Sequence, residues 1–250
     1  MTQRVKVASL PDCVAYVQLC PLIKALRDKK KIVIIAGAGI SAAAGIPIFD
    51  AMPMASTTIF NMSMYNNEND TKILNEIFSD MCHRVQSANP TQFHHVLEAI
   101  TEEGRLHRLY FQNINGLDTQ LAPLKTQIPL PPKGPSHFDP ALFASESSLP
   151  SCTECKVHKL TGKAPVLRPR VWLYLDDDYP DANAIGSVAD ADLQKKFDLV
   201  VVVASALKVE SAKKLMKDVC TAVRRGGGIA VLINLKAPTR DLDFFDLVIE

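Results

Sequence analysis

The sequence lacks several features that would assign it to a functional class at once. Its formal net charge is +1 over 250 residues, so no global field draws it to nucleic acid or to an anionic membrane. No apolar run approaches the roughly 20 residues that a membrane span needs. The beginning of the chain has no basic segment leading into an apolar core, so we expect no signal peptide.

Familiar catalytic signatures are also missing. Neither a G-x-S-x-G nucleophile elbow nor an H-E-x-x-H zinc motif occurs. Four histidines lie on predicted helices or at a strand start without a partner pattern for nucleophilic catalysis: His83, His94, His95 and His107. We therefore expect a surface role or a hydrogen-bonded core role for each of them.

The six cysteines are scattered, apart from one close pair, Cys152 and Cys155. Without a secretion signal, this usage indicates a reducing compartment, nuclear or cytoplasmic, and not a disulfide framework. One C-x-x-C pair supplies two thiolates, whereas a structural zinc usually takes four ligands. A cysteine pair without metal is therefore slightly favoured, with Cys152 and Cys155 as the ligands if zinc binds.

Hydrophobic runs and helical patterns alternate along the chain. Buried parallel strands are predicted at 31–37, 105–113, 197–204 and 228–235, and residues 245–250 could form one more strand. Helices are predicted at 14–28, 71–87, 91–103 and 208–228. A loop is predicted at 51–70. Strands and helices at these spacings form βαβ units. The sequence therefore predicts an α/β fold with a doubly wound, Rossmann-like parallel sheet.

One segment does not follow this rhythm. Residues 123–163 are rich in proline, which excludes long helices and central strands. We therefore expect a single domain over 1–250, in which 1–122 and 164–250 form the large lobe and 123–163 form a reduced small subdomain. Two short basic groups, Lys29-Lys30-Lys31 and Arg224-Arg225, are interpreted as solvated helix ends, with nuclear import as a minor alternative.

Two motifs suggest a binding site. Gly37-Ala38-Gly39-Ile40-Ser41-Ala42 fits G-x-G-x-x-A after a strand, where glycine lets backbone N–H groups approach a pyrophosphate. A tight turn without a ligand explains the same residues equally well. After the second strand, Gln112, Asn113 and Asn115 could read an amide-bearing ligand, because sites in open sheets lie at the carboxyl ends of strands. Turn capping by asparagine is the alternative there.

Taken in order, these stretches resemble the sirtuins, the NAD-dependent protein-lysine deacylases, and most closely the fungal nuclear branch that deacetylates histone. The similar stretches are "GAGISAAAGIPIFD", "FQNINGL", "LPSCTEC" with "VLRPRVWLYLDDDYPDA", "VVVVASALKVESAKKLM" and "AVLINLKAP". The resemblance implies NAD as cofactor, and it implies an acetylated histone or another nuclear protein as partner, with no direct nucleic-acid or membrane contact. The cofactor-binding residues that it implies are Gly37, Ala38, Gly39, Ser41, Gln112, Asn113, Asn115, Ser205 and Asn234.

The sequence departs from the sirtuin pattern where the chemistry should occur. Pro131, Pro132 or Lys133 occupies the position of the histidine that serves as general base, and His137 is only a weak substitute. The Asp-Phe-Arg of the cofactor loop is Ile48-Phe49-Asp50, and the first zinc cysteine pair is absent.

Smaller changes affect the rest of the site. Asn115 replaces an aspartate, Ala204 a glycine, and Leu175-Asp176 the glycine-glutamate pair of the peptide slot. These departures predict a catalytically impaired binding, scaffold or regulatory module with weak or vestigial NAD binding and doubtful zinc. An active deacetylase using His137 is the alternative, and a dehydrogenase-type NAD binder is disfavoured. The family continues beyond "DLVIE", so the chain is also expected to be a truncated form or fragment.

Overall fold

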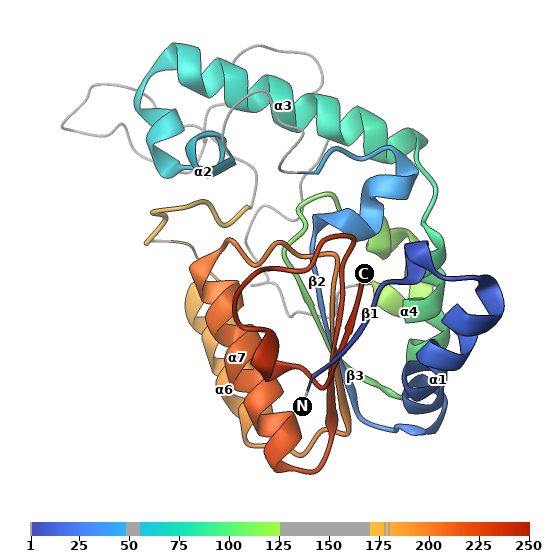
Figure 1. Ribbon diagram of the computed structural model, residues 1–250. Helices are drawn as coiled ribbons and strands as arrows, with labels where there is room; N and C mark the ends of the chain where they lie inside the picture. Colours follow the sequence, from blue (N-terminus) through green and yellow to red (C-terminus); the bar gives the residue numbers. More distant parts are fainter. Residues whose placement is uncertain (1, 49–55, 126–170, 178, 180) are drawn as a thin grey trace. The chain divides into compact units, whose positions relative to one another are not determined.

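The computed structural model describes residues 2–48, 56–125, 171–177, 179 and 181–250 (Figure 1). The chain divides into two compact units. The first consists of Met1–Ala44, Pro90–Lys125 and Pro180–Glu250, and the second of Gly45–Asn89 and Thr126–Tyr179. The small subdomain predicted at 123–163 lies, from residue 126 onwards, outside the described residues, and its extent stays a prediction.

The first unit is built on one six-stranded parallel sheet. Its strands are β1 (Gln3–Val5), β2 (Ile32–Ala36), β3 (Leu106–Phe111), β4 (Leu199–Val203), β5 (Ile229–Ile233) and β6 (Leu247–Ile249). They lie in the order β1-β6-β5-β4-β2-β3, and every neighbouring pair is parallel. All five residues of β2 and all five of β4 are buried. Their continuous apolar, mostly β-branched sequences suit strands that are covered on both faces.

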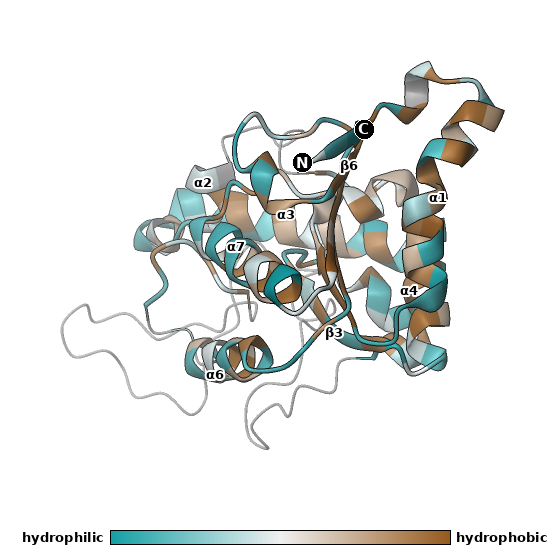
Figure 2. Ribbon diagram, turned by 60° about the horizontal axis from the view of Figure 1, so that its bottom comes forward, coloured by the Kyte–Doolittle hydropathy of each residue, from teal (hydrophilic) through white to brown (hydrophobic). Residues whose placement is uncertain are grey.

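Helices cover both faces of this sheet (Figure 1). Helices α1 (Asp12–Asp28) and α4 (Gln92–Glu102) lie on one face, and α6 (Ala182–Leu193) and α7 (Glu210–Arg225) on the other. Successive strand residues point to opposite faces of the sheet and so belong to two different hydrophobic clusters. Ile32 and Ile34 pack with residues of α1 and α4, and Val33 and Ile35 pack with residues of α7. Figure 2 shows the strands in the hydrophobic colour, while α7 is banded with hydrophilic residues. The predicted doubly wound α/β fold is therefore confirmed.

The sequence predictions differ from the structure at four places. Strand β1 is not predicted, because three residues carry too little pattern, and it forms by pairing with β6. Helix α6 is also not predicted. Helix α1 continues through Pro21, which the sequence suggests as a break. The loop predicted at 51–70 is wrong from residue 56 onwards, where helical turns begin.

The second unit has its own hydrophobic core. Helix α2 (Ser56–Ile59), a 3-10 helix (Met62–Asn66) and helix α3 (Glu68–Ser87) supply most of its described residues. Its buried side chains include Ile59, Phe60, Met64, Leu74, Phe78, Met81 and Leu173. The side chain of Asn67 accepts a hydrogen bond from the N–H of Asp70 and so caps the start of α3.

The first unit also contains short 3-10 helices. They are η1 (Val7–Ser9), η2 (Ala38–Ala44), η5 (Leu117–Gln120), η6 (Ala122–Leu124) and η7 (Leu242–Phe244). Helices η1, η2 and η5 follow strands β1, β2 and β3, so they lie at the carboxyl edge of the sheet. Within the described part of the chain, no helix has the length and apolar character needed to cross a bilayer.

A buried carboxylate fastens α6 to the edge strand β3. The side chain of Asp192 is 1% exposed and accepts hydrogen bonds from Arg108 Nε at 2.6 Å and Tyr110 Oη at 2.8 Å. Lys195 Nζ donates to it at 3.2 Å. Burial by itself would raise the pKa of Asp192, but these hydrogen bonds outweigh it and lower the pKa to about 2. Asp192 is therefore ionised wherever the protein is folded at ordinary pH.

Candidate functional site

The glycine turn after β2 is packed tightly against the loop that follows β4. Gly37 N donates to Val203 O at 2.9 Å, and Gly39 N donates to Ala204 O at 3.2 Å. A Cβ added to Gly37 would lie 2.4 Å from Ala204 O and 2.6 Å from the Cα of Ser205. Only glycine fits at position 37. The N–H groups of Gly37 and Gly39 are thus hydrogen-bonded within the fold. A contact between these residues and phosphates stays a prediction.

Three of the predicted site residues meet at the carboxyl edge of the sheet. Gln112 follows β3, Ser205 lies two residues after β4, and Asn234 follows β5. Ser205 Oγ donates to Gln112 Oε1 at 3.1 Å and accepts from Leu207 N at 3.2 Å. Asn234 Nδ2 donates to Ser205 O at 3.0 Å. The loop after β4 therefore connects residues that lie more than 100 positions apart in the sequence.

Several buried polar atoms near this edge have no hydrogen-bond partner among the described residues. They are Ser41 Oγ, Gln112 Nε2 and both amide atoms of Asn113. Ser41 is completely buried. A buried polar group without a partner costs roughly 1–3 kcal/mol, so such groups usually mark a missing ligand or water. One hydroxyl and two carboxamides suit a ligand that is rich in hydroxyl, carbonyl and amide groups.

Asn115 has a local role. Its Oδ1 accepts a hydrogen bond from Leu117 N at 3.0 Å, and Gly116, with φ 66°, begins the 3-10 helix η5. This is the capping alternative for Asn115. A contact between Asn115 and a cofactor stays a prediction.

The loop after β4 is also conformationally unusual. Ala204 and Leu207 both have φ 51°, in the left-handed region that favours glycine. Each costs on the order of 1 kcal/mol, and such residues concentrate at functional sites. The N–H of Ala204 donates to Ile233 O at 2.9 Å, so the end of β5 helps to hold this conformation.

The start of α4 anchors the loop that follows β2. Thr91 Oγ1 donates to the carbonyl of Ile40 at 2.8 Å, and the N–H of Thr91 donates to His94 Nδ1 at 3.1 Å. His94 is buried, and this burial, with a smaller effect of His95, lowers its pKa. Nδ1 must be unprotonated here, because it accepts a hydrogen bond from the main-chain N–H of Thr91. His94 is thus a hydrogen-bonded core histidine, as its position in the sequence suggests.

One titratable residue of this region, Asp118, is not apparent from the sequence. It lies in the first turn of η5, is 7% exposed, and burial raises its pKa to about 6. Its only signal in the sequence is an acid just after the carboxamide cluster, and burial cannot be read from that. Since a carboxyl group that titrates near pH 6 is rare on a protein surface, Asp118 is the most perturbed acid beside the candidate site.

Replacing Asp118 with asparagine is expected to stabilise the protein at neutral pH. The folded state holds the proton of Asp118 more tightly than the unfolded chain does, so stability is lost as the pH rises from about 4 to about 6. Asp118→Asn avoids this cost, and we expect a gain of about 3 kcal/mol at pH 7.5 that vanishes near pH 4. Urea unfolding of both proteins at the two pH values measures it. An equal difference at both pH values would contradict the assignment.

Other predicted positions lie outside the described residues. These are Phe49 and Asp50 of the cofactor loop, Pro131, Pro132 and Lys133 at the position of the catalytic histidine, His137, and the cysteine pair Cys152 and Cys155. Ile48 is described and is 37% exposed. The described residues contain no group of three or more His, Cys, Asp or Glu that could hold a metal ion. Zinc at the cysteine pair therefore stays a prediction.

Comparisons with known proteins agree with this fold. Residues 37–125 match the model of the Sir2 family. The chain is 33% identical to the NAD-dependent protein deacetylase hst4 of Emericella nidulans, over 93% of this chain and 47% of the relative. It is 31% identical to hst4 of Schizosaccharomyces pombe, over 94% of this chain and 66% of the relative. It is 32% identical to the NAD-dependent histone deacetylase HST4 of Saccharomyces cerevisiae, over 90% of this chain and 74% of the relative.

Solved structures show the same architecture. A Sir2 homologue in complex with NAD superposes with a TM-score of 0.67 at 18% identity, over 92% of this chain and 87% of that one. A Sir2 complex with a p53 peptide and NAD superposes with a TM-score of 0.65 at 22% identity, over 92% of both chains. At these identities the structures establish the fold, while the fungal relatives establish the relationship in sequence. The chain belongs to the Sir2, or sirtuin, family.

Proposed function

We propose that the chain binds NAD or ADP-ribose at the carboxyl edge of its sheet and has an impaired catalytic role, acting as a binding, scaffold or regulatory module. One observation carries the binding part of this proposal. Ser41, Gln112 and Asn113 hold buried polar atoms without partners among the described residues, directly beside a glycine turn. Sirtuins use NAD as cosubstrate, and a family relative has been solved with it.

The chemistry of these residues fits such a ligand. A hydroxyl and two carboxamides can donate to and accept from ribose hydroxyls and a carboxamide. Bound NAD supplies a ribose carbon that a substrate oxygen can attack with loss of nicotinamide. Ser205 holds the Gln112 carboxamide in place, and Thr91 holds the Ile40 carbonyl of the cofactor loop. The chain therefore keeps a preorganised set of polar groups for recognition.

The impairment is supported by residues at three further positions. Pro131, Pro132 or Lys133 stands where the family has its general base. Leu175 stands where the family has a glycine, with φ 58° and 77% exposure. A bulky residue in this left-handed conformation is strained, and its side chain occupies space that glycine leaves open to a peptide strand. The carboxamide of Asn115 is engaged in capping η5.

The alternative function is an active NAD-dependent lysine deacetylase that uses His137 and acts on an acetylated histone. The names of the fungal relatives favour it, since all three are called NAD-dependent deacetylases and one of them a histone deacetylase. The chain spans only 47% to 74% of these relatives, so their activity and substrates are proposals for it. The histone in the name of the Saccharomyces cerevisiae relative favours a nuclear location for this chain.

Calorimetric titration tests binding, and nicotinamide release tests catalysis. We expect ADP-ribose to bind and Asn113→Ala to weaken it about tenfold, because one or two hydrogen bonds to a buried amide are lost. Asn183→Ala, on the exposed surface of α6, is the control and should bind as the parent does. With NAD and an acetylated histone peptide, we expect no nicotinamide release.

The possible results separate the two parts of the proposal. Absence of ADP-ribose binding would remove the binding function. Nicotinamide release that depends on the acetylated peptide would remove the impairment, and its loss in His137→Ala would establish the alternative. The histone deacetylase HST4 of Saccharomyces cerevisiae serves as the positive control for the assay.

A further inference from the structure

Basic residues that are far apart in the sequence meet at the amino edge of the sheet, opposite the candidate site. Lys29–Lys31 lead into β2, Lys195 and Lys196 precede β4, and Arg224 and Arg225 end α7 before β5. These strands are parallel neighbours, so they begin at one edge. Their first residues are joined by backbone hydrogen bonds, from Asp198 N to Lys31 O at 3.0 Å and from Ile229 N to Asp198 O at 3.1 Å. The topology thus gathers three basic groups.

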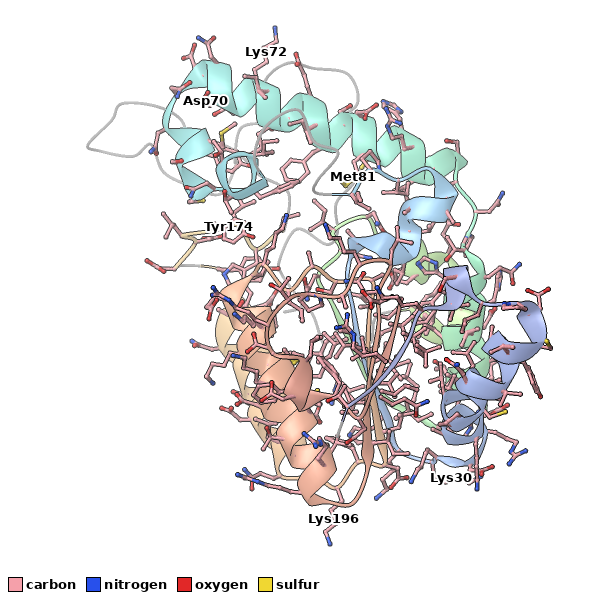
Figure 3. All side chains as sticks on the ribbon, viewed as in Figure 1. Lys30, Asp70, Lys72, Met81, Tyr174 and Lys196 are labelled. Carbon is pink, nitrogen blue, oxygen red and sulfur yellow. The ribbon has the colours of Figure 1, made fainter. Side chains whose placement is uncertain are left out.

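Most of these cations are not neutralised. Arg224 pairs with Asp246, and Lys195 with the buried Asp192. The other five have no acidic partner within ion-pair distance among the described residues: Lys29, Lys30, Lys31, Lys196 and Arg225. We call these five residues the amino-edge cations. Figure 3 shows two of them, Lys30 and Lys196, pointing away from the protein at the same end of the first unit.

Several acids lie near these cations, and each of them is already bonded: Asp28 pairs with Arg27, and Asp246 with Arg224. Asp198 Oδ2 accepts from the N–H of Lys30 at 3.1 Å and of Lys31 at 3.0 Å, so its charge is held by the main chain at the start of β2. Because these carboxylates are bonded to other groups, the five amino-edge cations remain without an ion-pair partner among the described residues. A protein with a net charge of +1 therefore carries a local cationic strip that its overall charge conceals.

The composition of the strip favours phosphate over a protein surface. Lysine is depleted at protein interfaces, whose cores are apolar. The exposed large hydrophobic residues of the described chain all lie elsewhere, and Phe197, the aromatic residue of this segment, is 2% exposed. Without an aromatic side chain to stack on, an unpaired base has no partner here, whereas recognition of single strands depends on such stacking. Long cationic side chains on adjacent strand starts suit the backbone of a duplex.

We propose that the amino-edge cations bind the phosphate backbone of double-stranded DNA without sequence preference. From β5 to β2 the strand starts span about 10 Å, and each DNA strand carries one charge per about 3.4 Å, so about three phosphates lie along the strip and the reach of the long side chains adds about one more. The strands place the glycine turn at the opposite edge of the same sheet. DNA and a nucleotide therefore occupy different surfaces of this unit. The proposal does not depend on nucleotide binding.

Fluorescence anisotropy with a labelled duplex of about 20 base pairs tests this. We expect micromolar affinity at about 50 mM salt and a loss of about 100-fold at about 200 mM, as release of counterions from about four phosphates requires. Combined Lys30→Gln, Lys31→Gln and Lys196→Gln should weaken binding at least about tenfold and reduce the salt slope by about 2 to 3. A second duplex of unrelated sequence should bind within about twofold of the first.

The matched control removes the same charge from other exposed lysines. Lys6→Gln, Lys72→Gln and Lys214→Gln together should leave DNA affinity within about twofold. Thermal melting of both triple variants checks that the fold is kept. No binding at about 50 mM salt, or equal losses in both variants, would overturn the proposal. So would a labelled polyglutamate peptide that binds in place of DNA and is released by the amino-edge substitutions, since this would indicate an acidic protein partner.

Discussion

Gly37→Ala is expected to lower the free energy of unfolding by at least about 3 kcal/mol and to abolish ADP-ribose binding. The new methyl group would meet Ala204 O at 2.4 Å and Ser205 Cα at 2.6 Å. Both are main-chain atoms, so no rotamer change relieves the contact. The loop after β4 must move instead, and it is held by the bond from Ala204 N to Ile233 O. Moving it also displaces Ser205 from Gln112.

Denaturant unfolding and calorimetry measure the two effects. Gly186→Ala is the matched control, because a Cβ at Gly186 in α6 has no neighbour within 4 Å. Alanine is the better helix former, so this variant should gain up to about 1 kcal/mol and bind as the parent does. If Gly37→Ala kept both stability and binding, this would contradict the close packing of the turn after β2 against the loop after β4.

Asp192→Ala should destabilise the protein by about 3–5 kcal/mol. The carboxylate is buried and holds Arg108, Tyr110 and Lys195 together. Its removal leaves these groups without their common acceptor, and α6 loses its attachment to β3. Thermal or urea unfolding at pH 7 measures the loss. Asp218→Ala is the control, because Asp218 pairs with Lys214 at an exposed position of α7 and should cost less than about 1 kcal/mol.

The dependence on pH distinguishes Asp192 from a residue that merely fills space. Its pKa in the folded protein is lowered to about 2, so its stabilisation is fully present above about pH 4 and is lost as the pH falls towards 2. The parent should lose about 2 kcal/mol over this range on account of Asp192. Asp192→Ala should lack that part of the acid transition. Parallel pH dependences in the two proteins would refute the assignment.

Much of the fold follows from the sequence, because buried parallel strands have a distinctive composition. The runs ending at Ala36 and Val203 are continuously apolar, and α7 between β4 and β5 is plainly amphipathic. Strand β1 could not be predicted, since its three residues acquire their role only by pairing with β6 at the other end of the chain. The turns at 56–66 are likewise stabilised by burial of Ile59, Phe60 and Met64, which local pattern does not reveal.

The sequence indicates residues of the candidate site but not the hydrogen bonds that connect them. Motifs indicate Gly37 and Gln112, and the resemblance to sirtuins implies Asn234, yet the hydrogen bonds through Ser205 join segments that no local pattern relates. Asp118 was missed for a similar reason, because an acid in a turn is normally solvated and only the fold buries it. The amino-edge cations were each visible as short basic groups. Their proximity is a property of strand order alone.

The hydroxyl of Ser205 gives the candidate site a polarity. A main-chain N–H can only donate, so the bond from Leu207 N fixes Ser205 Oγ as an acceptor at one side and frees its proton for Gln112 Oε1. The Gln112 carboxamide is thereby oriented with its Nε2 left over. At this point the protein presents a donor, and it selects a ligand atom that has a lone pair to offer. A ligand with a donor at that point would find no acceptor, because Ser205 of the loop after β4 fixes the orientation of the Gln112 carboxamide.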